Sequence, residues 1–435
     1  MTVQRPLVGV VADDITGAGD IAGLFAKHGY AARVFTKDAD LETVAARVRE
    51  ARTDVVILDT DSRLVAPDIA AERVRAATRA LQRAGCTVFW KKTCSVFRGN
   101  VGQEFDAMLE VLGESFGVAV AAFPKNGRTT VGGQHFVRGV PLHESEFKDD
   151  PVHPRTTADL VSSLGAQTKR RVASIGLEYV RGELSTTLDA AEHAGIGYAL
   201  LDAETQDDLA HIARAVAQER VLLGSSALAE ELPRVWTPPE PFNPLKGVRL
   251  EGHVGVLGIA ASVMPQTRAQ LETFEHACGA VIVMDSSAAL RDPGHTVEDL
   301  AEQASAVLER GGDVVVRSEN TADGVTAARA IGETLGMDAV AVSTQISSTL
   351  AEVARRVTAR TGVQRFIALG GDTSAALCRA LEVTELLTIQ EIAPGLPSSL
   401  VVGARPLLVV LKSGSFGKEG FLLEAIAHLR GLGTA

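Results

Sequence analysis

Short runs of apolar residues alternate along this chain with longer segments in which apolar residues recur every third or fourth position. The short runs predict buried strands, and the recurrence at about 3.6 residues predicts helices. Strands that alternate with helices favour parallel sheets flanked by helices, so we expect an α/β protein. The strands expected in the first half are Leu7–Ala12, Ala32–Phe35, Val55–Asp59, Thr87–Lys91, Val118–Phe123, Arg171–Ile175, Tyr198–Asp202 and Arg220–Leu223.

The second half repeats this alternation after a proline-rich segment. Thr237–Pro244 holds four prolines in eight residues, a composition typical of an extended linker. We therefore predict two domains, residues 1–236 and 248–435, each a mostly parallel sheet flanked by helices, with a linker at 237–247. The elements expected in the second half are strands at His253–Gly258, Ala280–Met284, Asp313–Val316, Arg365–Leu369, Leu387–Ile392 and Leu407–Leu411, and helices at Val297–Glu309 and Ile346–Thr361.

Two adjacent carboxylates, Asp13 and Asp14, stand between the expected strand Leu7–Ala12 and a helix pattern that ends at Gly29. In open α/β sheets ligands bind beside the carboxyl ends of strands, so an active site is expected at this position. The alternative is a solvated turn in which Asp14 or Thr16 caps the helix.

Further groups suited to a small hydroxylated acid follow other strands of the first half. Arginine and lysine can hold a carboxylate, and arginine can do so with two hydrogen bonds. The long polar segment Phe123–His153 is expected to be a functional loop. The candidates for acid binding are Asp61, Arg63, Lys92, Thr93, Cys94, Ser95, Arg98 and Arg128.

The second half contains three strand ends that are rich in glycine or serine. Free amide groups at a glycine turn and the positive end of the following helix can bind a phosphate. A single turn of this kind is more often structural, but three in one domain favour nucleotide binding. The candidates are Ser262 before a helix near Pro265, Gly370, Gly371, Asp372 and Thr373 before a helix at Ala375–Leu381, and Lys412 and Gly414 after the last strand. No GxxxxGK[ST] motif occurs.

Composition narrows the classes of partner. The net charge of -11 and the isoelectric point near 5.5 argue against nucleic acids and membrane surfaces. No signal segment and no membrane-spanning apolar run is evident, which favours a cytoplasmic protein. The four cysteines lack CxxC spacing and predict neither a zinc site nor a disulfide framework, and no metal-binding residues are predicted.

The order of the motifs resembles that of the four-carbon acid sugar kinase family across essentially the whole chain. The motifs are VADDITGAGD, KKTCSVFRGNVGQEFDAM, AFPKNGRTTVGGQHFVRGVPLHESEF, GSSALAEEL, ALGGDTSAAL, IAPGLPSS and LKSGSFG. The resemblance implies that ATP phosphorylates threonate, erythronate or an oxo-tetronate-type acid. It also implies an N-terminal domain that holds the sugar acid, a C-terminal domain that holds ATP, and an active site in the cleft between them.

The resemblance also assigns residues. Substrate contacts fall on Asp13 and Asp14, on Lys92–Ser95 and on the position of Asp61. ATP contacts fall on Ser262, Gly370–Thr373 and Gly414, and we add Lys412 and Gly395 of IAPGLPSS. The chain departs from the family where Asp61 replaces a frequent arginine, where Met264 replaces a common serine and where Asp372 replaces a frequent glutamate.

Phosphoryl transfer needs an in-line hydroxyl, charge neutralisation and a carboxylate that accepts the hydroxyl proton. Asp13 and Asp14 are both candidates for this catalytic base. We favour Asp13 as the member that faces the substrate, with the other aspartate capping the helix or holding the loop, and we expect Mg²⁺ to bridge the ATP phosphates with few protein ligands. The acids left open are threonate, erythronate, 3-oxo-tetronate and a branched acid such as 3-oxo-isoapionate, and a homodimer is the default assembly.

Two other classes of protein stay open from the residues alone. Gly17–Ala22 matches G-x-G-x-x-A after a strand, so an NAD-dependent oxidoreductase acting on a small hydroxy acid is conceivable, although two acids beside a pyrophosphate are unfavourable. The second alternative is a non-catalytic sugar-acid binding protein, which leaves the nucleotide-like second half unexplained.

Overall fold

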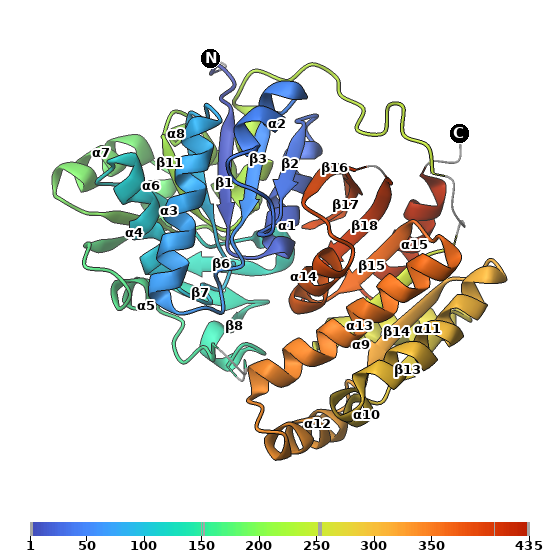
Figure 1. Cartoon of the computed structure of the whole chain (residues 1–435). Coiled ribbons are helices and arrows are strands. Elements are labelled where there is room, and N and C mark those ends of the chain that lie inside the picture. Colours follow the sequence, from blue (N-terminus) through green and yellow to red (C-terminus); the bar gives the residue numbers. More distant parts are fainter. Residues whose placement is uncertain (1–2, 149, 151–152, 251–254, 404, 433–435) are drawn as a thin grey trace. The chain divides into compact units, whose positions relative to one another are not determined.

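The computed structural model describes residues 3–148, 150, 153–250, 255–403 and 405–432. The chain forms two compact units, Met1–Phe242 and Asn243–Ala435, which Figure 1 shows in blue to green and in yellow to red. The division falls inside the proline-rich segment. No helix in the described ranges is both long and apolar enough to cross a membrane.

The first unit is built on a parallel sheet of eight strands in the order β2-β3-β1-β4-β11-β5-β10-β9. The strands lie where the apolar runs predict them, with ends that differ by up to three residues. They are β1 (Val8–Ala12), β2 (Ala32–Phe35), β3 (Val55–Asp59), β4 (Val88–Lys92), β5 (Gly117–Val120), β9 (Val172–Ile175), β10 (Tyr198–Leu201) and β11 (Val221–Gly224).

Both faces of the central strands are covered, which explains why their sequences are continuously apolar rather than alternating. Neighbouring residues of β4 show the two faces. Phe89 belongs to the core under the helices of residues 67–83 and 101–112, whereas the ring of Trp90 meets Phe25 of the first helix edge-on at 6.3 Å between ring centroids. The prediction of a helix-flanked parallel sheet is therefore confirmed for this unit.

The helices of the first unit fill the connections between the strands. The first, α1, ends at Ala26, and Gly29 follows its end with a positive φ of 81°. The helices are α1 (Ile15–Ala26), α2 (Val44–Glu50), α3 (Pro67–Arg83), α4 (Val101–Leu112), α5 (Leu160–Gly165), α6 (Leu177–Val180), α7 (Leu184–His193) and α8 (Gln206–Ala215).

The expectation of an unstructured loop at Phe123–His153 is wrong. The segment contains a small antiparallel sheet of β6 (Arg128–Val131), β7 (Gln134–Val137) and β8 (Val140–Pro141). Gly132 and Gly133 form the turn between β6 and β7, and their amides donate hydrogen bonds to the carboxylate of Asp202. Polar hairpins with one exposed side lack the long apolar run by which buried strands are recognised, so the pattern did not reveal them.

The second unit has a mixed sheet in the order β13-β14-β12-β15-β18-β17-β16. The pairs from β13 to β18 are parallel, and β17 runs antiparallel to both of its neighbours. The strands are β12 (Leu257–Ala260), β13 (Ala280–Met284), β14 (Val314–Ser318), β15 (Arg365–Leu369), β16 (Glu385–Ala393), β17 (Leu396–Val401) and β18 (Leu407–Lys412).

Two strand predictions in this unit need correction. The expected strand His253–Gly258 begins among residues outside the described ranges, and the observed strand β12 starts only at Leu257. The expected strand Leu387–Ile392 is the centre of a longer β16, which turns back at Gly395 into β17. Pro397 and the two serines of β17 concealed that strand, because they are poor strand formers in isolation.

The helices of the second unit include both long helices expected from the periodic pattern. Each starts earlier than predicted, α11 at Pro293 and α13 at Ala339. The helices are α9 (Pro265–His276), α10 (Ser286–Arg291), α11 (Pro293–Glu309), α12 (Ala322–Thr334), α13 (Ala339–Thr361), α14 (Gly371–Ala380) and α15 (Phe421–Gly431).

Candidate active site

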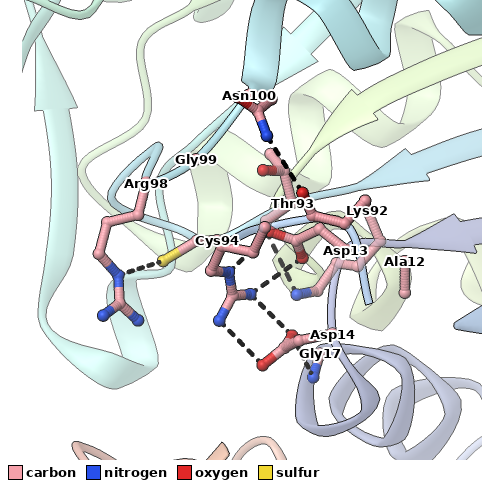
Figure 2. A network of polar contacts seen from close by, with 12 residues as sticks. Ala12, Asp13, Asp14, Gly17, Lys92, Thr93, Cys94, Arg98, Gly99 and Asn100 are labelled. Atoms are coloured by element: carbon pink, nitrogen blue, oxygen red, sulfur yellow. Dashed lines mark hydrogen bonds and ion pairs between the residues drawn. The ribbon is translucent and has the colours of Figure 1, made fainter. Parts of the chain in front are cut away.

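Three strand ends of the first unit meet at one edge of its sheet. In the parallel register Ala12 of β1 lies beside Asp59 of β3 and beside Lys92 of β4. The residues that follow each strand therefore emerge together, as Figure 2 shows for Asp13, Asp14 and Lys92–Cys94. Parallel pairing thus assembles groups that are far apart in sequence.

Asp14 is the N-cap of α1. Its extended backbone lets the carboxylate accept a hydrogen bond from the Gly17 amide at 2.9 Å and another from the Thr16 hydroxyl at 2.6 Å. These contacts satisfy a helix amide that has no partner within the helix. The expectation that Asp14 caps the helix is therefore confirmed.

Arg63 joins Asp13 and Asp14. Its guanidinium donates to both oxygens of Asp13, from Nε at 2.8 Å and from Nη2 at 2.9 Å. It also donates to both oxygens of Asp14, from Nη2 at 2.7 Å and from Nη1 at 2.9 Å. Asp13 is only 1% exposed, so its charge requires a close partner of this kind.

Opposing effects set the ionisation of Asp13. Burial alone would raise the pKa of its carboxyl, but the positive charges of Arg63, Lys91 and Lys92 outweigh burial and hold that pKa well below its usual range. Asp13 is therefore an ionised carboxylate that the surrounding cations stabilise strongly.

A buried network behind the site holds the loop that carries Arg63. Glu104 of α4 pairs with Lys91 at 3.0 Å and accepts a hydrogen bond from the Ser62 hydroxyl. Asn100 donates to the carbonyl oxygens of Ser62 and Val65, at 3.1 and 2.9 Å. The sequence did not single out Glu104, because nothing in a helical pattern shows that one of its carboxylates is buried.

Lys92 is nearly buried beside the two aspartates. Its Nζ lies 3.6 Å from Asp20 Oδ2 and 3.3 Å from the carbonyl oxygen of Thr93. A Cβ built on Gly17 would come within 2.9 Å of this nitrogen and 2.5 Å of Asp14 Oδ1. Glycine at position 17 therefore permits the close approach of α1 to Lys92.

Cys94 and Arg98 form a second part of the site. Arg98 Nε lies 3.4 Å from Cys94 Sγ, and its Nη1 pairs with Asp150 at 2.7 Å. Burial alone would raise the pKa of the Cys94 thiol, but Arg98 and Arg63 outweigh burial and lower that pKa to about 7. Arg155, which the sequence did not indicate, supports this loop through a hydrogen bond of 2.9 Å to the Phe97 carbonyl.

Other expected acid-binding residues have different surroundings. Asp61 pairs with Lys37 at 2.9 Å, and 40% of its side chain is exposed. Arg128 is buried in β6, where it donates to the Asn126 carbonyl. Thr93 is fully buried, and Ser95 is partly exposed. Asp61 thus pairs with a lysine, and the arginine that meets the two carboxylates is Arg63.

In the second unit, three strand ends also meet at one edge. Ala260 of β12 lies beside Leu369 of β15, which lies beside Lys412 of β18. A Cβ built on Gly414 would come within 2.5 Å of Ser262 Oγ, and one built on Gly370 within 3.0 Å of Thr373 Oγ1. The side chains of Ser262 and Met264 are thus packed against Gly414, and those of Ser262 and Thr373 against Gly370, as closely as the missing Cβ atoms permit.

Gly370 ends β15 with a φ of 127° and is the N-cap of α14, whose first turn has no side-chain cap. The helix begins at Gly371, and Thr373 Oγ1 accepts a hydrogen bond from the Ala261 amide at 3.2 Å. Asp372 points its carboxylate toward Ser343 Oγ of α13, at 3.3 Å. An uncapped helix start beside a glycine turn suits an anionic group.

Lys412 is buried, and none of its hydrogen bonds within the described ranges goes to a carboxylate. Its Nζ donates to Thr267 Oγ1 at 3.1 Å and to the carbonyl oxygens of Ser413 and Gly414 at 2.9 and 3.0 Å. Burial lowers the pKa of this ammonium group to about 7. Lys412 therefore fixes the turn that carries Gly414.

Gly395 lies in the turn between β16 and β17, where its amide donates to Glu391. A Cβ on Gly417 would come within 3.0 Å of Leu396, the residue after Gly395. This contact brings the hairpin close to the segment that follows Gly414.

Comparison with known proteins identifies the family. Residues 8–232 match a family model described as a sugar-binding N-terminal domain, and residues 257–422 match one described as a nucleotide-binding C-terminal domain. The 3-oxo-tetronate kinase of Brucella melitensis biotype 1 is 33% identical, over 96% of this chain and 94% of its own. The D-erythronate kinase of Heliobacterium modesticaldum is 32% identical, over 97% and 96%.

The chain belongs to the four-carbon acid sugar kinase family, which confirms the resemblance, and it is an enzyme of the kinase class. Solved structures agree on the α/β fold. A Salmonella typhimurium LT2 protein provisionally described as a tRNA synthase is 27% identical with a TM-score of 0.79, over 96% of this chain and 98% of its own. A Haemophilus influenzae protein is 28% identical with a TM-score of 0.71, over 97% and 100%.

The lowered pKa of Lys412 predicts a pH dependence of stability. Between pH about 7 and 10.5 the unfolded chain holds a proton on this lysine that the folded chain lacks. The free energy of unfolding should therefore rise with pH across this window. Lys412→Met retains most of the apolar stem and cannot titrate, so the rise should become shallower. Melting temperatures of the unmodified enzyme and of Lys412→Met from pH 7 to 9.5 test this. If both melting temperatures changed equally with pH, the prediction would be contradicted.

Proposed function

We propose that this enzyme transfers the γ-phosphoryl group of ATP to a hydroxyl of a small sugar acid. Four-carbon acids (threonate, erythronate or 3-oxo-tetronate) and a branched acid such as 3-oxo-isoapionate are the candidates. The observation that carries the proposal is the pair Asp13 and Asp14, joined by Arg63 at the carboxyl end of β1. The names of the Brucella and Heliobacterium relatives support the class of acid.

Arg63, Lys92 and Arg98 supply the positive charge for the acid. Arg63 and Lys92 lie beside the aspartates, and Arg98 lies beside Cys94. An arginine fork matches the two oxygens of a carboxylate, and hydroxyl groups of the acid can bond to Thr93 and Ser95. That Arg128 and Asp61 contact the substrate stays a prediction.

The second unit is suited to ATP. Because Gly414 and Gly370 carry no Cβ, Ser262 and Thr373 pack directly against these turns, which brings their hydroxyl groups to the same edge as the first amides of α14. Ser262, Gly371, Thr373 and the α14 amides would hold the phosphates, whereas Asp372, Gly395 and Lys412 shape the surrounding turns.

Mg²⁺ stays a prediction. In the described ranges no group of three or more His, Cys, Asp and Glu side chains could hold a metal ion. Mg²⁺ commonly binds through phosphates and water with few protein ligands, so we derive no step through it. An active site between the two units, a homodimer and a cytoplasmic location also stay predictions.

In the proposed reaction, Asp13 accepts the proton of the attacking hydroxyl. Its carboxyl group is ionised across the physiological pH range, because nearby cations hold its pKa well below the usual range, and Lys92 stabilises negative charge near it. Asp14 holds α1 and the Arg63 fork in place. The remaining barrier is lowered by orientation and by charge neutralisation, which dominate phosphoryl transfer.

The decisive experiment measures ADP formation with ATP and each of the four candidate acids, followed by mass spectrometry of the product. A phosphorylated acid supports the proposal, and its identity gives the substrate. The shift of the melting temperature with ATP or NAD, together with the turnover assay, distinguishes the kinase from the two alternative classes, an oxidoreductase and a binding protein. A melting temperature raised by NAD alone would favour an oxidoreductase, and binding of acid without turnover would favour a binding protein.

The two aspartates should respond differently to the same substitution. Asp13→Asn removes the proton acceptor and should lower kcat by roughly 10²–10⁴-fold. Asp14→Asn keeps a capping side chain and should cost about 1 kcal/mol of stability or less, with a much smaller loss of rate. Steady-state kinetics and melting curves of both variants decide this. Near-normal kcat in Asp13→Asn would mean that another group is the base.

Gly414 should be required for ATP and not for the acid. Gly414→Val places a side chain against Ser262 Oγ and should weaken ATP binding at least about tenfold by overpacking. Gly403→Val is the matched control, because a Cβ there meets nothing within 4 Å. Calorimetric affinities for ATP and for the acid test this. If Gly414→Val lost affinity for both ligands equally, Gly414 would not belong to the ATP site. The same would follow if Gly403→Val lost as much ATP affinity as Gly414→Val.

A further inference from the structure

Arg63 occupies the position at which an acceptor hydroxyl would have to meet Asp13. A guanidinium has five N–H donors, and Arg63 uses four of them on the oxygens of Asp13 and Asp14. Both Asp13 oxygens are engaged in this fork. A carboxylate held in this way is a poor proton acceptor, because accepting the proton would break a bidentate, largely buried ion pair.

Asp13 depends on the Arg63 guanidinium for its hydrogen bonds more than Asp14 does. Asp14 has two further hydrogen bonds, from the Gly17 amide and the Thr16 hydroxyl. In the described part of the chain, the Asp13 carboxylate accepts hydrogen bonds from Arg63 alone. Departure of Arg63 would therefore leave Asp14 held as the helix cap and would expose the oxygens of Asp13.

Arg63 has the chemistry of a group that a substrate carboxylate can recruit. Its side chain is 15% exposed, compared with 1% for Asp13. The two aspartates and Arg63 together carry a net charge of -1, so one carboxylate can replace another at the guanidinium without a change in the pairing. A neutral sugar offers no such replacement.

We propose that the carboxylate of the substrate acid takes the Arg63 guanidinium from Asp13, and that this exchange converts Asp13 from an ion-pair partner into the base. The inference rests on the proposed function, and it makes Arg63 the residue that couples recognition of an acid to catalysis. It also predicts selectivity for acids, since a neutral acceptor leaves Asp13 paired with Arg63.

The transfer step then balances. The hydroxyl oxygen of the acid forms a bond to the γ-phosphorus of ATP, while the bond from that phosphorus to the β–γ bridging oxygen breaks and its electron pair leaves with ADP. The hydroxyl proton moves to a freed Asp13 oxygen and passes to water after the phosphorylated acid departs. Arg63 returns to Asp13 in the emptied site.

The charges around Asp13 define the expected pH effect. Lys91 and Lys92 face it from the end of β4 and stay when Arg63 moves. The acidic groups that face it are Asp14, Asp59, Glu104 and Cys94, and burial raises the pKa of Asp59 and of Glu104. Burial favours the protonated form of Asp13, and Arg63 favours the ionised form. Loss of Arg63 should therefore raise the pKa of Asp13.

The first test uses the unmodified enzyme. The acid limb of kcat/KM reports the free enzyme and the free acid, whose own carboxyl group titrates at about pH 3.5, and the acid limb of kcat reports the complex with substrate. Because bound acid removes Arg63 from Asp13, the kcat limb should lie at least about one pH unit above the kcat/KM limb, a tenfold change in proton affinity. Coincident limbs would overturn the inference.

The second test compares acceptors. The unmodified enzyme should favour a four-carbon sugar acid over the neutral polyol erythritol by at least about 10²-fold in kcat/KM, the usual contribution of a general base. Arg63→Gln removes both the carboxylate partner and the block on Asp13. Its activity with the acid should fall, its activity with erythritol should hold or rise, and the ratio should shrink by about 10²-fold.

Arg75→Gln is the matched control, because Arg75 forms an exposed ion pair with Glu110 outside the site, and its acid-to-polyol ratio should be unchanged. An Arg63→Gln enzyme that melts normally and keeps the full preference for the acid would overturn this inference and leave the proposed function standing. If the unmodified enzyme phosphorylates none of the acids, the proposed function fails and this inference fails with it. The pH profiles need no variant, so a folding defect in Arg63→Gln does not protect the inference.

Discussion

A buried charge must be paired, and the active-site edge of the first unit is organised around that constraint. The parallel register of β1, β3 and β4 brings Asp13, Lys91 and Lys92 to one place, where isolated charges would cost several kcal/mol each. Arg63 compensates the two aspartates, and Glu104 compensates Lys91. The same pairs that stabilise the fold therefore fix the geometry and the ionisation of the candidate base.

The corresponding edge of the second unit is organised by close packing at glycines rather than by ion pairs. Its strand ends carry glycine, serine and threonine, and its buried lysine, Lys412, donates to backbone oxygens and a hydroxyl rather than to a carboxylate. Packing at Gly414 and Gly370 is limited by the missing Cβ atoms rather than by charge. One unit thus offers paired charges suited to an acid and a proton, and the other offers polar backbone suited to phosphates.

The site predictions from the sequence succeeded where a residue's role depends on its near neighbours in the chain. Asp14 as a helix cap is such a case, since the strand end, the aspartate and the helix are contiguous. The assignment of Asp61 as the acid's partner has no support from its contacts, because its exposed side chain pairs with Lys37 while Arg63, two residues on, turns inward. Glu104 and Arg155 were missed, since their importance lies in contacts with distant segments.

The sequence by itself determined the alternation of strands and helices, the family, and the chemistry at the end of each strand, because these depend on local periodicity and on contiguous motifs. Tertiary structure alone decided which strand ends lie side by side, that the polar segment after Phe123 folds into a small sheet, and that Arg63 bridges two carboxylates. The physical reason is that burial and ion pairing are set by parallel register between strands far apart in the chain, and local sequence patterns carry no record of that register.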